Sequence, residues 1–244
     1  MKILSIDFDF FQNVTCEQLS LYPDGIDHSK GISEIVWGSV YSTNGEEIEK
    51  IDILNEEFSL TKEILRKQMP DVPVLVAYSH KSIYDFIKLH ETKKPLEIIN
   101  IDMHHDILNG NNEIDCGNWL SHVIDDREAA GCKTKLRWIT NPVSIEAYGN
   151  KVFEDNEFRC ITEKTIKDIR KDKFDAIFLC RSDTWTPPHL DKYFTELCNV
   201  IKTHFTNIRI QKGVEKPRKD YLSIAKEIFK AYKNFDKELL KSKK

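Results

Sequence analysis

Short apolar segments rich in β-branched residues alternate with amphipathic helical patterns along most of this chain. Strands buried on both faces read as continuous apolar runs, whereas amphipathic helices repeat apolar residues three and four apart. Their alternation predicts an α/β three-layer sandwich, a mostly parallel sheet with helices on both faces. The expected strands are residues 2–8, 72–78, 96–101, 135–139 and 176–180, with a weaker one at 158–161, and the expected helices are 57–68, 82–90, 118–130, 190–205 and 221–240.

The length of 244 residues is enough for one large α/β domain, and we expect a single domain over residues 1–244. A C-terminal helix of about 218–242 is expected to pack on it, with its lysines facing solvent. Segment 23–49 holds four of the nine glycines, so we interpret it as an irregular excursion from the sheet. Such a long loop could line a substrate groove or be a mere insertion.

Composition narrows the possible partners. Hydrophobic residues make up 40% and the formal net charge is -4, so a soluble protein that does not bind nucleic acid is expected. The apolar start carries Asp7 and Asp9 and lacks a small-residue cleavage site, and no apolar run reaches the roughly 18 residues of a membrane span. We therefore expect no membrane partner and a cytoplasmic location. The six scattered cysteines predict free, mostly buried thiols rather than a cysteine-based zinc site.

Metal-type side chains follow three of the predicted strands. Ligands of an α/β sheet gather beyond the carboxyl ends of its parallel strands, which is where these residues fall. A straight strand from residue 102 to 106 would span about 13 Å, too far for one small centre, so the chain must bend near Asp106. The turn-forming sequence at 109–112 would permit that bend. The six candidate ligands are Asp7, Asp9, His80, Asp102, His104 and Asp106.

Each of these residues alone could simply cap a helix or form a salt bridge, but together they imply a charge problem. Four carboxylates at neighbouring buried strand ends would repel one another, and two divalent cations would cancel their charge. Oxygen and imidazole ligands suit Mn²⁺, and Zn²⁺ or Fe²⁺ fit the same donors. Two such ions can share a hydroxide at neutral pH, which predicts hydrolysis of a carbonyl, phosphoryl or guanidinium centre.

The same residues resemble the arginase–deacetylase superfamily. Its ureohydrolases carry an Asp-x-His-x-Asp strand end, an upstream strand-end histidine and an Asp-x-Asp strand end. Asp102, His104 and Asp106 match the first, His80 the second, and Asp7 and Asp9 the third. The chain departs from ordinary arginases because its Asp-x-Asp strand comes first, which implies a permuted strand order.

A closer resemblance is to the atypical arginase-like family that includes the peptide arginases. It rests on Ser-Ile-Asp-Phe-Asp-Phe-Phe (5–11), Asp-Met-His-His-Asp (102–106), Cys-Gly-Asn-Trp (116–119) and Cys-Arg-Ser-Asp-Thr-Trp-Thr-Pro-Pro (180–188), and it covers about residues 1–190. The resemblance implies conversion of arginine side chains in a peptide, such as a ribosomal precursor peptide, to ornithine with release of urea. This would be a post-translational modification performed by a hydroxide that bridges two Mn²⁺ ions.

Roles for individual residues follow from the resemblance. Asp102 and Asp7 would bridge the metals, with His80 and Asp106 completing one and His104 and Asp9 the other. The site residues expected outside the metal ligands are Asp183 for the substrate guanidinium, with Ser182 assisting; Trp185 stacked on that guanidinium; Asn118 and Trp119 in the pocket wall; and His105 or His122 as the proton donor.

Other readings stay open. Deacetylases of the same superfamily usually keep one zinc and dispense with two ligands, and this chain retains all six. Asp7 and Asp9 after an N-terminal strand also resemble the nucleophile motif of haloacid-dehalogenase-type phosphatases, although Phe11 stands where that family has Thr or Val. Asp183 could cap a turn, Trp185 could be core, and a lone helical histidine such as His122 is usually structural.

Overall fold

The computed structural model describes residues 1–23, 25, 30–90, 93–108, 113–148, 160–163 and 165–242. Seven strands form one sheet in the order β7-β6-β5-β1-β8-β4-β9, and every pairing in it is parallel. A two-stranded antiparallel sheet, β2-β3, lies beside it. The strands are β1 Lys2–Asp7, β2 Gln12–Asn13, β3 Asp52–Ile53, β4 Val74–Ala77, β5 Leu96–Asp102, β6 Thr134–Thr140, β7 Cys160–Glu163, β8 Ala176–Cys180 and β9 Ile208–Ile210.

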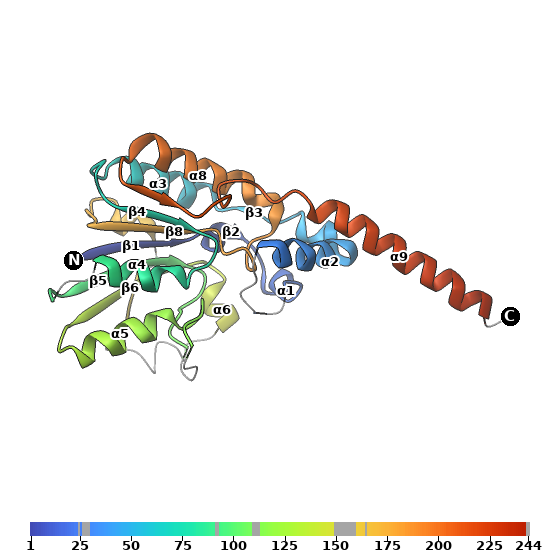
Figure 1. Cartoon of the computed structure of the whole chain (residues 1–244), viewed down its shortest axis with the longest axis horizontal. Helices are drawn as coiled ribbons and strands as arrows, with labels where there is room; N and C mark the ends of the chain where they lie inside the picture. Colours follow the sequence, from blue (N-terminus) through green and yellow to red (C-terminus); the bar gives the residue numbers. More distant parts are fainter. Residues whose placement is uncertain are drawn as a thin grey trace.

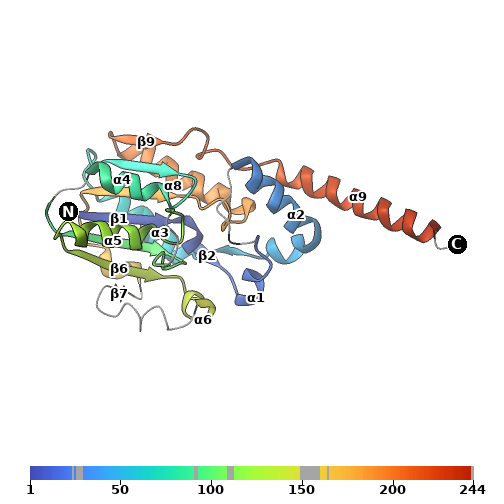
Figure 2. The same ribbon diagram turned by 60° about the horizontal axis from the view of Figure 1, so that its bottom comes forward.

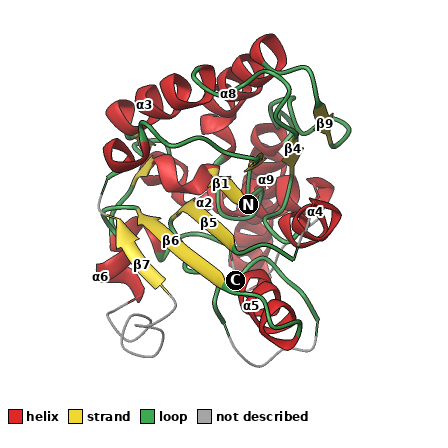
Figure 3. Ribbon diagram, turned by 90° about the vertical axis from the view of Figure 1, so that its left-hand side faces the viewer, coloured by secondary structure: helices red, strands yellow, loops and turns green. Residues whose placement is uncertain are grey.

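Helices cover both faces of the large sheet (Figures 1 and 3). Helices α3 and α8 lie on one face, and α4 and α5 lie on the other. The α-helices are α1 Cys16–Leu19, α2 Lys30–Ile48, α3 Asn55–Arg66, α4 Ser82–His90, α5 Trp119–Ala129, α6 Ser144–Tyr148, α8 Asp191–His204 and α9 Tyr221–Ser242, and the 3-10 turns are η1 Phe8–Phe11, η2 Ile166–Ile169 and η3 Pro188–Leu190. The predicted three-layer α/β arrangement is confirmed.

Side-chain alternation along the central strands divides the core into two layers. Leu4 and Ile6 of β1 belong to the cluster under α3 and α8, whereas Ile3 belongs to the cluster under α4 and α5. Because neighbours along a strand point to opposite faces, Ser5 and Asp7 share the face of Ile3. In β5, Asn100 and Asp102 share the face of Ile98 for the same reason. Polar side chains therefore line the α4–α5 face of two adjacent strands.

The expectation of an irregular excursion at 23–49 was wrong where the structure describes it. Helix α2 occupies Lys30–Ile48, with Trp37 and Ser33 fully buried. Gly38 serves helix packing here instead of a loop, because a Cβ at this position would lie 2.5 Å from Cγ2 of Ile224 in α9. Glycine costs a helix about 1 kcal/mol relative to alanine, and close approach of the two helices offsets that cost. Residues 24 and 26–29 lie outside the described part.

The C-terminal helix packs on the domain only through its beginning. Tyr221 contacts Tyr41 of α2 with ring centroids 4.7 Å apart, and Ala225 is buried. Farther along, Phe229 and Tyr232 are exposed, and α9 extends away from the rest of the chain (Figures 1 and 2). Within the described residues, none of the helices combines the length and apolar character that a membrane crossing requires.

Two smaller expectations also need correction. Strand β9 (Ile208–Ile210) extends the sheet past β4, and the apolar pattern did not predict it. Five cysteines are free in the structure, of which Cys180 and Cys198 are buried and Cys16, Cys116 and Cys132 are partly exposed. The thiols are therefore less uniformly buried than expected.

Candidate metal centre

The predicted ligands meet at one edge of the sheet. Strand β1 ends at Asp7, β5 ends at Asp102, and His80 follows β4. Because β5, β1, β8 and β4 are adjacent and parallel, their carboxyl ends converge. The acidic ligands and His80 are at most 3% exposed, and only the side chain of His104, at 19%, reaches solvent.

Four of these side chains form what we call the inner group, namely His80, Asp7, Asp102 and Asp106. Nδ1 of His80 lies 3.1 Å from Oδ2 of Asp7, 3.0 Å from Oδ2 of Asp102 and 2.9 Å from Oδ2 of Asp106. An imidazole nitrogen carries at most one hydrogen, so it cannot donate to three carboxylates. None of the three contacts has hydrogen-bond geometry among the described residues. Donor atoms that crowd around one point in this way are arranged like ligands of a cation.

The remaining ligands form an outer group, consisting of Asp9, Asp102 and His104. Nδ1 of His104 lies 2.9 Å from Oδ2 of Asp9 and 3.7 Å from Oδ1 of Asp102. Asp102 therefore takes part in both groups, with Oδ2 facing the inner group and Oδ1 the outer group. The predicted pairing of His80 with Asp106, and of His104 with Asp9, agrees with these distances.

Local backbone conformation turns the ligands toward one another. Asp7 caps the 3-10 turn η1, accepting the N–H of Asp9 at 3.2 Å, and this turn keeps both carboxylates at the sheet edge. Among the described residues other than glycine, Asp106 and Ser182 have positive φ angles, of 54° and 55°. A left-handed conformation costs a non-glycine residue roughly 1 kcal/mol or more, and such strain gathers at functional sites. The positive φ of Asp106 also provides the bend that the sequence required.

Neutral polar side chains from four different segments form hydrogen bonds with the ligands. Ser5 Oγ lies 2.7 Å from Nε2 of His80, so the other ring nitrogen faces the carboxylates. Such partners fix the orientation of metal ligands and raise their basicity. The other three contacts are Ser182 Oγ to Asp7 Oδ2 at 2.9 Å, Asn100 Nδ2 to Asp102 Oδ2 at 3.0 Å, and Trp119 Nε1 to Asp106 Oδ2 at 2.5 Å.

Burial and mutual repulsion shift the protonation of the cluster. Burial, together with the neighbouring Asp102 charge, raises the pKa of Asp106 to about 7. Burial and the charge of Asp7 also raise the pKa of Asp9. The pKa of His80 is raised, because the carboxylates, Asp106 above all, outweigh the opposing effect of burial. Despite burial, contacts with His104 and His80 lower the pKa of Asp102, which stays ionised. Without cations, protons must relieve the excess negative charge.

The donor set fits divalent cations. Among the described residues, ligand atoms within 4.8 Å of one another occur in three overlapping groups: His80, Asp102 and Asp106; Asp9, Asp102 and His104; and Asp7, His80 and Cys180. Carboxylate and imidazole donors suit Mn²⁺, Fe²⁺ and Zn²⁺. The buried Nδ1 of His80 and Oδ2 of Asp9, which lack hydrogen bonds, are the atoms that a cation would satisfy.

Three of the other predicted site residues lie at the cluster. Ser182 and Trp119 contact ligand carboxylates, as described above. Trp185 is partly exposed, with its ring centroid 4.7 Å from that of His104. Backbone packs closely on the far end of this indole, since a Cβ on Gly25 would lie 2.9 Å from Cη2. Trp185 therefore borders the exposed side of the outer group.

Asp183 lies elsewhere and already binds an arginine of the chain itself. Its Oδ1 accepts from Nε of Arg181 at 2.6 Å and its Oδ2 accepts from Nη2 at 3.0 Å. Asp191 joins this pair, because its Oδ2 accepts from Nη1 of Arg181 at 3.3 Å, and its Oδ1 accepts from Nη2 of Arg218 at 2.7 Å. We call these four residues the arginine network. Because Asp183 is bidentately occupied, the geometry weighs against its predicted role in holding a substrate guanidinium.

The remaining predicted site residues are His105, which neighbours the ligand His104, and His122 and Asn118, which lie at helix α5 and the turn before it. Nδ1 of His105 accepts the N–H of Ile107 at 3.0 Å, which leaves the ring hydrogen on Nε2. Burial and the charge of His104 lower the pKa of His105. His122 lies against Tyr84 of α4, with centroids 6.5 Å apart, and Asn118 shapes the turn before α5 by accepting the N–H of Asp115. Neither His122 nor Asn118 contacts the inner or outer group through these bonds.

Several residues at the site were not singled out by sequence reasoning. Ser5 and Asn100 support ligands, and each is a polar residue two positions before a ligand inside an apolar strand. A polar residue inside a buried apolar strand predicts a polar partner on the same face, because a buried polar side chain needs a hydrogen bond. Cys180 carried no comparable signal, and neither did Arg218, which is buried.

Searches against protein-family models, curated proteins and solved structures found no match.

Proposed function

We propose that this chain is a metal-dependent hydrolase of guanidino groups that converts arginine side chains of a peptide to ornithine and urea. The observation that carries the proposal is the crowding of three carboxylates around one buried nitrogen, Nδ1 of His80. The choice of a guanidino substrate, and of a peptide over free arginine, rests on the sequence resemblance.

Two Mn²⁺ ions are the proposed cofactors, with Zn²⁺ or Fe²⁺ as alternatives. The inner group would hold one ion and the outer group the other, with Asp102 facing both. Two dications balance the four carboxylates, and the excess charge described above then needs no protons. When bound, such a pair supplies a water molecule acidic enough to act as a nucleophile near pH 7.

The residues around the ligands would orient the substrate and exclude water. The exposed edge of His104 is the open side, so the guanidinium would arrive beside Trp185, whose ring can stack on a planar cation. In the overall reaction water adds its oxygen to the guanidinium carbon, and the bond from that carbon to the ornithine nitrogen breaks. The nitrogen takes up a proton and urea leaves. His105, next to His104 and carrying its hydrogen on Nε2, is the nearer candidate for that proton transfer.

The alternatives have less support from the contacts. A deacetylase would need only one zinc, and the outer group would then be redundant. A phosphatase would use Asp7 as a nucleophile, but this carboxylate is 2% exposed, accepts a hydrogen bond from Ser182 and faces His80. The same protein preparation can be assayed for both alternatives, with acetyl-lysine peptides as deacetylase substrates and a phosphate ester as the phosphatase substrate.

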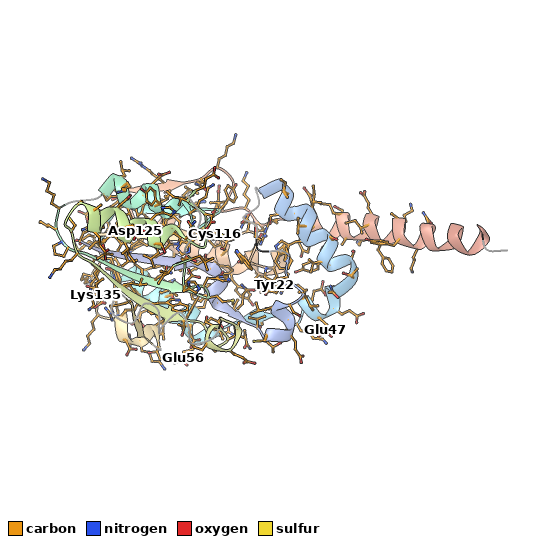
Figure 4. The ribbon with its side chains drawn as sticks, turned by 90° about the horizontal axis from the view of Figure 1, so that it is seen from below. Tyr22, Glu47, Glu56, Cys116, Asp125 and Lys135 are labelled. Carbon is orange, nitrogen blue, oxygen red and sulfur yellow. The ribbon has the colours of Figure 1, made fainter. Side chains whose placement is uncertain are left out.

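The deciding experiment is incubation with Mn²⁺ and an arginine-containing peptide, with free arginine in parallel. We expect release of urea and a peptide lighter by the mass of cyanamide, CH₂N₂, at each converted arginine. Loss of activity is expected in Asp102→Asn, which removes one charge shared by both groups. Asp125→Asn, on the outer side of α5, is the matched control and is expected to retain activity (Figure 4).

Two outcomes would contradict the proposal. One is the absence of urea from any arginine substrate although Mn²⁺ binds at two per chain. The other is full activity of Asp102→Asn, which would place the chemistry elsewhere. Urea from free arginine but not from peptides would retain the reaction and overturn the peptide substrate.

A further inference from the structure

Cys180 lies within the metal cluster although no ligand motif includes it. It is fully buried at the end of β8, in register with Asp7 of β1 and Ala77 of β4. Its Sγ, a ligand atom of Asp7 and a ligand nitrogen of His80 all lie within 4.8 Å of one another. The sulfur therefore stands beside the inner group.

The strand, rather than a chance side-chain rotation, fixes this position. Along β8, Ile177 and Leu179 pack under α3 and α8, whereas Phe178 and Cys180 face α4 and α5. This is the face on which Asp7 and Asp102 lie. Phe178 stacks on the His80 ring with an interplanar angle of 6°, so the two residues of β8 hold the imidazole and sulfur side by side.

A second observation points to a ligand at the same place. Nδ1 of His80 is buried and aimed into the inner group, without hydrogen-bond geometry to any described partner. A cation held by His80 and Asp7 would also lie next to the sulfur, because ligand atoms of these two residues and the Cys180 Sγ are within 4.8 Å of one another. The outer group, in contrast, offers only carboxylate oxygens and an imidazole within its own set.

We propose that Cys180 is a thiolate ligand of the inner metal position, which makes the two positions of the cluster chemically unequal. The inference rests on the proposed binding of divalent cations. Thiolate favours Zn²⁺ over Mn²⁺, whereas oxygen donors favour Mn²⁺, so the inner position selects the softer ion. On binding, a metal–sulfur bond of about 2.3 Å forms, the S–H bond breaks and its proton passes to the buffer. No electrons are transferred.

Cobalt(II) is the probe, because a thiolate bound to it gives a charge-transfer absorption in the near ultraviolet. The metal-free protein is titrated with Co²⁺ while its near-ultraviolet and visible spectra are recorded. We expect the charge-transfer band with the first equivalent and only visible ligand-field bands to grow with the second. In Cys180→Ser the charge-transfer band should disappear, while ligand-field bands persist and show that the variant folds and binds.

Cys198→Ser is the matched control, because Cys198 is also buried but belongs to the core under α3 and α8. It should keep the charge-transfer band. In competition titrations, Cys180→Ser should lose roughly tenfold or more in Zn²⁺ affinity at the inner position, with Mn²⁺ affinity of the outer position unchanged.

The outcomes separate this inference from the proposed function. Ligand-field bands without a charge-transfer band in the unmodified protein would overturn the role of Cys180 and leave a metal centre in place. No cobalt spectrum at all, together with no heat of binding for Mn²⁺ or Zn²⁺, would overturn both. A charge-transfer band that survives in Cys180→Ser would assign the thiolate to another cysteine and overturn the inference.

Discussion

Two buried clusters of charge lie at the carboxyl edge of the same sheet, and they differ in balance. The arginine network pairs two arginines with two aspartates, and its ionic contacts run from 2.6 to 3.3 Å. The inner and outer groups together contain four aspartates and two histidines, with the carboxylates crowded around shared nitrogens. A buried charge must be paired or bind a metal. The balanced cluster is therefore part of the framework, and the unbalanced one is the candidate metal site.

The largest effect is expected from breaking the balanced cluster. Arg218→Met leaves Asp191 without its closest partner, and removal of one member of a buried ion pair costs about 3–5 kcal/mol of unfolding free energy. Urea denaturation measures the loss, which should be the same with and without Mn²⁺. Lys219→Met, at an exposed neighbouring position, is the control and should be close to neutral. A metal-dependent loss in Arg218→Met would show that the two clusters are not separate.

The unbalanced cluster should respond to metal instead. Mn²⁺ at a hundred times its dissociation constant should raise the unfolding free energy by about 2.7 kcal/mol for each ion bound, read from denaturation with and without a chelator. Asp106→Asn should lose most of this gain and yet be no less stable than the unmodified protein when both lack metal at pH 8, because burial and the Asp102 charge raise the pKa of Asp106 to about 7 and the neutral amide relieves that cost. A metal-free Asp106→Asn protein that unfolds several kcal/mol more easily would mean that the cluster is itself a framework element.

Metal stoichiometry tests whether the two groups are separate positions. Asp9 belongs to the outer group, so Asp9→Ala should reduce the bound metal from two ions per chain to one. Elemental analysis after dialysis against Mn²⁺ gives the count, and Asp125→Asn is again the control. Two ions retained in Asp9→Ala would contradict the division into inner and outer groups.

The smallest effect is expected from a residue that only supports a ligand. Ser5→Ala removes the oxygen that lies 2.7 Å from Nε2 of His80. Loss of such a partner typically weakens metal binding by about 10–100-fold. Competition with a metal indicator measures the change, and exposed Ser39→Ala should show none. If Ser5→Ala lowers stability but leaves metal affinity unchanged, the serine is a packing residue.

The sequence predicted the parts of the site that depend on strand ends. Asp7, His80 and Asp102 follow β-branched apolar runs, and parallel pairing brings such ends together regardless of chain order. The α/β layers and most helix positions could be predicted for the same reason, since periodicity reflects the face that each element buries. The fold family, the metal and the substrate stay predictions.

The sequence did not predict the features that arise from contacts between segments far apart in the chain. The glycines of α2 favoured a loop, and only the closeness of Ile224 in α9 explains why a helix carries glycine at position 38. Asp183 was assigned to the substrate because no sequence pattern predicts that the side chain of Arg181, two residues away, donates to its carboxylate. Figure 4 labels Tyr22, whose hydroxyl bonds Gln12 and whose ring contacts Trp37, another long-range arrangement without a local pattern.

The place of β1 in the sheet has a consequence for how the molecule is made. It lies between β5 and β8, and both of these neighbours come later in the chain, since their residues paired with β1 begin at 97 and 176. During translation β1 therefore lacks both of its partner strands until they have been synthesised. Unpaired apolar strand edges can associate with other chains. Asp7 and Asp9 at its end place charge beside that edge until residue 180 has emerged. The same carboxylates that are proposed to hold cations would thus help a nascent chain to stay soluble.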